Sequence, residues 1–291
     1  MADESSPPLS GELASGWSVP TEETRTLEAR FARRVLMTVP DRHNPKLHQV
    51  IEWANADDDL YALWTACNVT AMERLGMTDH GPVHVKIVMN IAVRLLRLLM
   101  ERGIEPSIVA TYGMEREDAE VIVALAALLH DVGMSIHRAD HESYSLFIAQ
   151  DKLKEILPAL YPGAAATLVR SDVLHAIIAH RSGGHPLTLE AGVVRLADAL
   201  DMAKGRSRVP FEAGSVSIHS ISAAAVERVS IEPGEDKPVR VRIDLLNSAG
   251  VFQLDKLLRD KLSGSGLEDY VEVTAAIEGE TEKRLMGAFR L

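Results

Sequence analysis

The chain has 291 residues, of which 46% are hydrophobic, so it is long and apolar enough to form a large buried core. Its formal net charge of −11 argues against a general nucleic-acid or anionic-membrane binder, because such affinity comes from clustered Lys and Arg. The single cysteine, Cys67, excludes an intramolecular disulfide and a cysteine-rich zinc site.

The first two hundred residues predict helices. Residues 1–25 are rich in Ser, Pro, Glu and Gly and predict a flexible N-terminal arm. Apolar residues at helical spacing predict helices within 45–76, broken near 55–59, and a helix that starts at the N-cap Asp79 with Pro82 in its first turn. Further helices are expected at about 117–130, 141–157, 164–180 and 190–202.

Beyond Met202 the pattern changes to period-2 spacing. Apolar and charged residues alternate over 239–245, which predicts a strand. The other expected elements are a partner strand at 226–231 with a turn at 233–236, a helix at 251–262 and a third strand at 270–277. The predicted fold is therefore mainly α: a helical domain over 26–204 followed by a small α+β domain over 205–291. An edge strand of that sheet could pair with a second copy, so a homodimer is one expected assembly.

The sequence also predicts where the protein resides. No apolar run approaches the ~20 residues that a membrane-spanning helix needs. The N-terminal residues lack the basic-then-apolar pattern of a secretion signal. We therefore expect a cytoplasmic protein with no membrane partner.

A histidine and an aspartate stand side by side where the most apolar predicted helix ends. His130 and Asp131 follow the run Ala127–Leu129, and Gly133 comes after them with only Val132 between. A buried imidazole and carboxylate are costly unless something binds them. A divalent metal would bind both, the first through nitrogen and the second through oxygen.

Other candidate ligands lie at or near the ends of predicted helices. Each alone is more often a hydrogen-bonded core or surface residue than a metal ligand, and Asp79 and Asp201 read as caps or ion-pair partners. Taken in chain order, however, the set favours a metal site. Its members are His80, His84, His137, His141, His175, His180 and Asp198.

This order resembles the HD-domain superfamily of metal-dependent phosphohydrolases, whose pattern is a His, an adjacent His-Asp and a distant Asp. His84, the pair His130-Asp131 and Asp198 match it, and the resemblance covers about residues 75–205. It implies an HD-type helical bundle. Binuclear members add histidines, for which His141 and His180 are the best candidates, with His137, His175 and His80 as alternates. The C-terminal part is similar to that of an uncharacterised prokaryotic subgroup.

The resemblance implies a function. We expect hydrolysis of a phosphomonoester or phosphodiester, and a small nucleotide as the substrate, by a metal-activated hydroxide. One or two divalent ions (Mn, Fe, Mg, Co or Zn) would be held by His84, His130, Asp131, His141, His180 and Asp198. Asp131 would bridge two ions, while Arg138 and Arg181 would bind the phosphate. A cluster of Lys204, Arg206 and Arg208 could clamp the leaving group or be a solvated linker.

Two family specificities are disfavoured, and two other functions stay open. Members that cleave cyclic dinucleotides carry Gly-Tyr-Pro after a His-His pair, whereas His180 is followed by Arg-Ser-Gly-Gly. Hydrolases of guanosine tetraphosphate follow His-Asp with an acidic pair, whereas this chain has Val-Gly-Met there. The open alternatives are an HD-type di-iron oxygenase and a non-catalytic regulatory protein that binds a nucleotide or metal.

Overall fold

A computed structural model describes residues 31, 34–202, 225–251, 254, 258–277 and 289–290. The predicted N-terminal arm, the predicted boundary between residues 204 and 205, and the cluster of Lys204, Arg206 and Arg208 lie outside these ranges. The domain limits therefore stay predictions.

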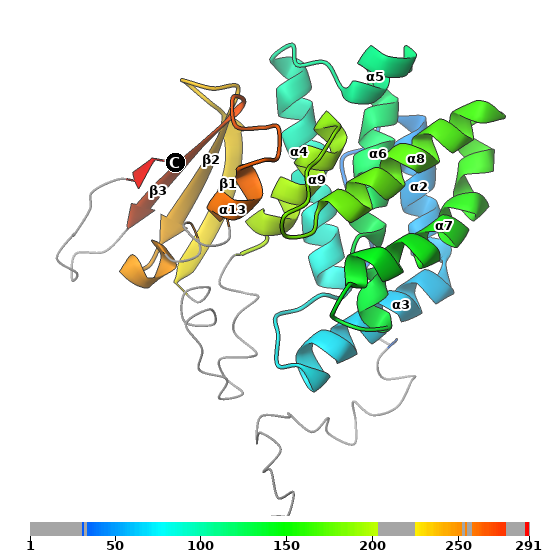
Figure 1. Cartoon of the computed structure of the whole chain (residues 1–291), viewed down its shortest axis with the longest axis horizontal. Helices are drawn as coiled ribbons and strands as arrows, with labels where there is room; N and C mark the ends of the chain where they lie inside the picture. The colour runs from blue at the N-terminus through cyan, green and yellow to red at the C-terminus, as the bar shows by residue number, and fades with distance from the viewer. Residues whose placement is uncertain are drawn as a thin grey trace, which may run out of the picture.

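The part of the chain before residue 202 is helical, as predicted (Figure 1). Its elements are α2 (Pro45–Ala56), α3 (Asp58–Asn68), the π-helix η2 (Val69–Arg74), α4 (Pro82–Glu101), α5 (Ser107–Tyr112), α6 (Arg116–Leu129), the 3-10 helix η3 (Val132–Ser135), α7 (His141–Leu160), α8 (Ala164–Ala179) and α9 (Leu189–Leu200). Every predicted helix is present, whereas α5 was not predicted.

The predicted start of α4 needs a correction. Gly81, not Asp79, is the N-cap, because Pro82 occupies the first turn and fixes where the helix begins. The carboxylate of Asp79 accepts a hydrogen bond of 2.6 Å from the backbone N–H of Gly81. Asp79 thus shapes the turn that leads into α4.

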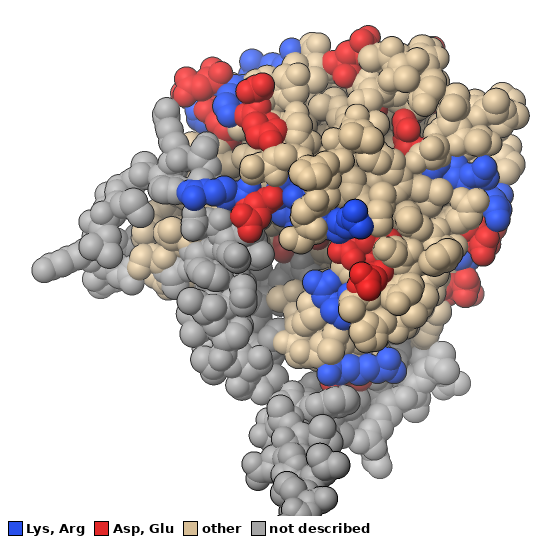
Figure 2. Space-filling model, viewed as in Figure 1, with Lys and Arg blue, Asp and Glu red and all other residues tan. Residues whose placement is uncertain are grey.

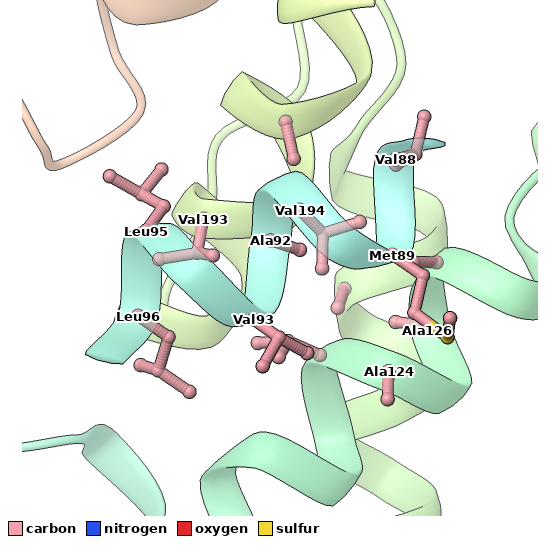
Figure 3. Packing of buried hydrophobic residues seen from close by; sticks show 14 of the residues in the cluster. Val88, Met89, Ala92, Val93, Leu95, Leu96, Ala124, Ala126, Val193 and Val194 are labelled. Carbon is pink, nitrogen blue, oxygen red and sulfur yellow. The ribbon is translucent and has the colours of Figure 1, made fainter. Parts of the chain in front are cut away.

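Helix α6 forms the centre of the helical part. All of its residues from Asp118 to Leu129 are buried, and it packs against α2, α4, α8 and α9. Figure 3 shows Met89 of α4 beside Ala126 of α6, in a layer that also includes Val194 of α9. This packing explains why α6 is apolar on every side.

The C-terminal part contains a sheet of order β1-β2-β3-β4. Strands β1 (Val226–Pro233) and β2 (Val239–Leu245) form the predicted hairpin, and β3 (Val271–Ile277) pairs with β2 in parallel. The two-residue β4 (Phe289–Arg290) is antiparallel to β3. Between β2 and β3 lie the 3-10 helix η5 (Ser248–Gly250) and α13 (Arg259–Leu262), which covers the end of the predicted helix 251–262. The mainly α fold with a small α+β part is confirmed, and all-α describes only the residues before 202.

The sheet packs on the helical part through β1, which lies beside α4 (Figure 1). Arg94 donates a hydrogen bond of 2.8 Å to the Ile231 carbonyl, and Arg102 donates one of 3.5 Å to the Gly234 carbonyl. One buried hydrophobic cluster runs from the helices into the sheet. Two backbone acceptors of the hairpin are therefore used within the chain, and pairing with a second copy stays a prediction.

The described residues contain no helix that is both long enough and apolar enough to cross a membrane. On the face shown in Figure 2, basic and acidic side chains are interspersed over the helical part. The excess of acidic residues therefore does not form one continuous area on that face.

Candidate metal centre

The position of His130 and Asp131 is set by side chains that cap the end of α6. The last carbonyls of a helix have no partner within it and need donors from elsewhere. Donors from α3 and α7 serve here: Trp64 Nε1 at 2.8 Å from the Leu128 oxygen, Ser145 Oγ at 2.7 Å from the His130 oxygen and Cys67 Sγ at 3.4 Å from the Asp131 oxygen. The turn that carries His130 and Asp131 is thus held by α3 on one side and by α7 on the other.

Gly133 brings α7 against this turn. A Cβ atom at Gly133 would lie 2.0 Å from the carbonyl oxygen of His141 and 2.5 Å from the backbone nitrogen of Ser145. Only glycine allows this approach, because real Cβ atoms do not come so close to backbone. The approach places His141 at the first turn of α7, with its Nε2 3.0 Å from Oδ1 of Asp131.

Four imidazoles converge on the buried carboxylate of Asp131. Its Oδ2 lies 3.3 Å from Nε2 of His84 and 3.4 Å from Nε2 of His130. Its Oδ1 lies 3.0 Å from Nε2 of His141 and 3.6 Å from Nε2 of His180. Each oxygen of the Asp131 carboxylate therefore faces its own pair of imidazole nitrogens.

The opposite nitrogen of each ring is anchored by an oxygen. The Nδ1 atoms contact Asp201 Oδ2 at 2.7 Å (His84), the Ala127 carbonyl at 2.8 Å (His130), the Arg138 carbonyl at 3.0 Å (His141) and the Ile177 carbonyl at 2.6 Å (His180). A carbonyl or an ionised carboxylate can only accept, so these contacts favour a proton on Nδ1 of His84, His130 and His180, whereas Nδ1 of His141 also lies 2.8 Å from the Arg138 guanidinium. A neutral ring in this tautomer has the Nε2 lone pair available for a metal ion.

Asp198 joins the site from α9. Its Oδ1 lies 3.7 Å from Nε2 of His84 and 3.8 Å from Nε2 of His130, while its Oδ2 lies 3.1 Å from Nζ of Lys261. Burial alone would raise the pKa of Asp198, but the Lys261 ammonium and the nearby imidazoles hold this pKa well below its usual range. The side chain is therefore a carboxylate at neutral pH.

The protonation states around Asp131 differ from ring to ring. Burial lowers the pKa of His130 to about 4, so that ring is neutral at pH 7. Burial also opposes the charge on His141, but hydrogen bonds to Asp131 and Glu142 outweigh it and raise its pKa to about 9. The pKa of Asp131 stays well below its usual range despite burial, because the imidazoles surround it.

The donor set fits divalent metal ions. Imidazole nitrogens and carboxylate oxygens bind Mn, Fe, Co and Zn ions, and carboxylates bind Mg. Three groups of donors each lie within 4.8 Å of one another: His84, His130 and Asp198; His130, Asp131 and His180; His141, Glu142 and His180. The six residues predicted as ligands are therefore brought together in one buried centre.

Two alternate histidines lie elsewhere. His175 Nε2 accepts a hydrogen bond from the Leu187 backbone, and His137 Nδ1 accepts one from the Ala139 backbone. His80 is nearer, since its ring centroid lies 5.4 Å from that of His84, and its Nδ1 lies 2.7 Å from the Thr78 carbonyl oxygen. Its Nδ1 is thereby occupied by the turn before α4.

The two predicted phosphate-binding arginines occupy different surroundings. The guanidinium of Arg138 lies beside the centre, 2.8 Å from Nδ1 of His141. The side chain of Arg181 is exposed, and its backbone carbonyl accepts a hydrogen bond from Arg195. Arg138 is therefore placed at the centre, whereas a role for the Arg181 side chain stays a prediction.

Sequence reasoning did not assign three residues of the centre. Glu142 lies 3.0 Å from Nδ1 of His141. Its position directly after that histidine in the sequence could have indicated that it belongs to the centre. Asp201 is expected to be a cap or ion-pair partner; it is the C-cap residue of α9, and its carboxylate contacts Nδ1 of His84. Nothing in the sequence near Lys261 indicates a place in the centre, because this lysine reaches Asp198 from the C-terminal part of the chain.

Comparison with known proteins agrees with this geometry. The HD domain family model matches residues 83–203, a range that includes all six predicted ligands. The chain is 45% identical over 213 residues to "Uncharacterized protein MJ1020" from Methanocaldococcus jannaschii, an alignment that covers 73% of this chain and 82% of that protein. No solved structure gives a significant match.

Proposed function

The chain belongs to the HD-domain family, whose members are metal-dependent hydrolases that bind divalent ions, and on this premise we propose that it hydrolyses a phosphomonoester or phosphodiester of a small nucleotide. The observation that carries the proposal is the position of Asp131. Its two oxygens each face two imidazole nitrogens, 3.0 to 3.6 Å away. A buried carboxylate with two imidazole nitrogens beside each oxygen is well placed to lie between two cations. This arrangement favours a metal ligand over a purely structural carboxylate.

We assign the donors around Asp131 to two ions. His84, His130 and Asp198 would hold one ion, and His141 and His180 would hold a second, while Glu142 lies on the Nδ1 side of His141. Bound divalent ions would lower the pKa of a water molecule toward neutrality and offset the charge of phosphate oxygens. Mn, Fe, Mg, Co and Zn are all compatible with these donors.

The chain's own groups would position the substrate. Arg138 lies beside His141 and carries a planar guanidinium, which can donate two parallel hydrogen bonds to a phosphate. Arg181 follows His180 at the same end of α8 and is proposed as a second donor. Cys67 does not serve as a nucleophile, because burial raises the pKa of its thiol and the sulfur lies against the Asp131 carbonyl.

Hydrolysis assays test the proposal. Protein loaded with Mn²⁺ or Co²⁺ is expected to cleave an aryl phosphate or one of a panel of nucleotides, and Asp131→Asn is expected to abolish this. His175→Ala is the matched control, since His175 contacts the Leu187 backbone instead of the centre. Failure to cleave the aryl phosphate and every nucleotide would contradict the proposal.

Two other outcomes would redirect it. Two irons per chain, with colour and oxygen uptake on an organophosphonate or a polyol, would support the di-iron oxygenase. Tight nucleotide binding without turnover, unchanged in Asp131→Ala, would support the regulatory protein.

A further inference from the structure

A lysine from the C-terminal part reaches the metal centre. Lys261 belongs to α13, which lies between the sheet and α9 in Figure 1. Its Nζ lies 3.1 Å from Oδ2 of Asp198 and also donates a hydrogen bond to the backbone carbonyl of His180. The α+β part therefore contributes directly to the site that the helices build.

The placement of α13 is held by a buried arginine. Arg195 of α9 donates to the Lys261 carbonyl at 3.0 Å and to the Asp260 carbonyl at 3.0 Å. Its other guanidinium nitrogen donates to the Arg181 carbonyl at 2.6 Å, just beyond α8. One side chain thus ties α13 to the chain that follows His180, so the approach of Lys261 is built into the fold.

A close backbone approach supports the same docking. A Cβ atom at Gly192 of α9 would lie 2.4 Å from the carbonyl oxygen of Ser265, just after α13. The segment that carries Lys261 therefore packs on α9 at a distance that only glycine permits.

Lys261 lies at the accessible edge of the centre. The side chains of Lys261 and Asp198 are 20% and 22% exposed, whereas that of Asp131 is 5% exposed. The Oδ1 atom of Asp198 faces the imidazoles and its Oδ2 faces the ammonium. An anion that enters the centre past Asp198 would meet the ammonium of Lys261.

The negative charge of the carboxylates in the centre favours an additional cation where a phosphate would bind. Its four carboxylates are those of Asp131, Glu142, Asp198 and Asp201. Two divalent ions would balance these charges, so the cations that offset a substrate phosphate would be side chains such as Arg138 and Lys261. A lysine has three N–H donors, and Lys261 uses two of them in the described residues, so one is left for an anionic oxygen.

We propose that Lys261 is a substrate-binding residue of this centre that contacts a phosphate oxygen. The inference rests on the proposed function. It also gives the α+β part a role in the reaction, because that part supplies the cation at the open edge. Asp198 and the His180 carbonyl hold the ammonium beside the ligands, which leaves its third N–H donor for the phosphate.

Phosphate binding tests the inference. Inorganic phosphate is titrated by calorimetry into the full chain loaded with Mn²⁺, and Mn²⁺ content is measured in parallel. Lys261→Met is expected to weaken phosphate binding about tenfold or more, the range of one hydrogen bond to a charged group. Lys261→Gln, which keeps a donor for the His180 carbonyl but has no charge, should show the same loss. Lys261→Arg should recover most of the affinity.

The matched control is Lys237→Met. Lys237 belongs to the same α+β part and donates to the backbone carbonyls of Glu268 and Val271, away from the centre. This variant should bind phosphate as the wild type does. Its thermal unfolding shows whether loss of a lysine–carbonyl contact alone disturbs the fold.

The outcomes separate this inference from the proposed function. Wild-type protein that takes up no Mn²⁺ would overturn the proposed function. Normal Mn²⁺ uptake with no phosphate binding, or with equal phosphate affinity in wild type, Lys261→Met and Lys261→Gln, would overturn the role of Lys261 alone. So would loss of Mn²⁺ from both variants, because Lys261 would then act only through Asp198.

Discussion

The carboxylate of Asp201 lies 2.7 Å from Nδ1 of His84, on the side of the ring opposite the nitrogen that faces Asp131. Both side chains are buried. Such a carboxylate orients a ligand imidazole and raises its basicity. The pair therefore supports His84 as a metal ligand and gives Asp201 a role that its sequence position did not reveal.

Asp201→Asn is expected to weaken metal binding. An asparagine has nearly the same shape but no charge, so the His84 ring loses the ionised acceptor that fixes its tautomer and raises its basicity. The affinity for Mn²⁺ should fall about 10- to 100-fold, as measured by titration with electron paramagnetic resonance. Asp79→Asn is the control, because Asp79 contacts the Gly81 backbone in the turn before α4. Equal affinities in the two variants would show that Asp201 does not support the centre.

Gly133→Ala is expected to separate α7 from the turn that carries Asp131. The new methyl group would collide with the His141 carbonyl at 2.0 Å, and backbone there cannot move aside cheaply. Such overpacking costs about 1–3 kcal/mol of the free energy of unfolding, which urea unfolding of the metal-free protein measures. Metal content should also fall, because His141 moves with α7.

Ser135→Ala is the control that distinguishes the steric effect of Gly133→Ala from the loss of one hydrogen bond in the same turn. Ser135 belongs to the same turn and donates a hydrogen bond of 2.6 Å to the Val132 carbonyl. Its replacement should cost about 1 kcal/mol and leave metal content unchanged. If Gly133→Ala behaves like Ser135→Ala in both measurements, the close approach has no functional consequence.

Asp172→Asn is expected to stabilise the protein at neutral pH. Burial, with a smaller effect from the Glu190 carboxylate, raises the pKa of Asp172 to about 6. A raised carboxyl pKa favours the native state below the unfolded value of ~3.9, and this contribution is lost as pH rises through about 6. The variant should therefore gain stability relative to wild type between pH 4 and 7. The gain should be about 1 kcal/mol after allowance for the half-exposed position.

Thermal unfolding across this pH range measures the trend. Asp151→Asn is the control, since Asp151 lies on α7 with its side chain 78% exposed. A difference between Asp172→Asn and wild type that stays constant from pH 4 to 7 would contradict the assigned pKa shift.

Apolar periodicity was enough to predict the long helices and strands β1, β2 and β3, but not β4, because burial of one face dominates the energetics of the longer elements. It failed for α5, whose six residues from Ser107 to Tyr112 complete fewer than two turns and bury only Ile108. The start of α4 was misplaced because a cap was assigned to Asp79 by residue type, while Pro82 set the boundary.

The candidate site was predictable to the extent that its residues follow one order along the chain. His84, His130, Asp131 and Asp198 stand in that order, and the structure brings them together. Lys261 lies 63 residues beyond Asp198 in a short charged helix, where a lysine usually faces solvent. Only the docking of α13 on α9 shows that it enters the centre.

Metal content after purification and dialysis tests the central claim most directly. Wild-type protein should retain one or two divalent ions per chain by elemental analysis. His130→Ala and Asp131→Ala should retain about a tenth or less, with unchanged helicity by circular dichroism. His137→Ala and His175→Ala remove imidazoles that lie outside the centre and should retain the wild-type amount. Full metal content in His130→Ala and Asp131→Ala would show that the centre around Asp131 is not the metal site.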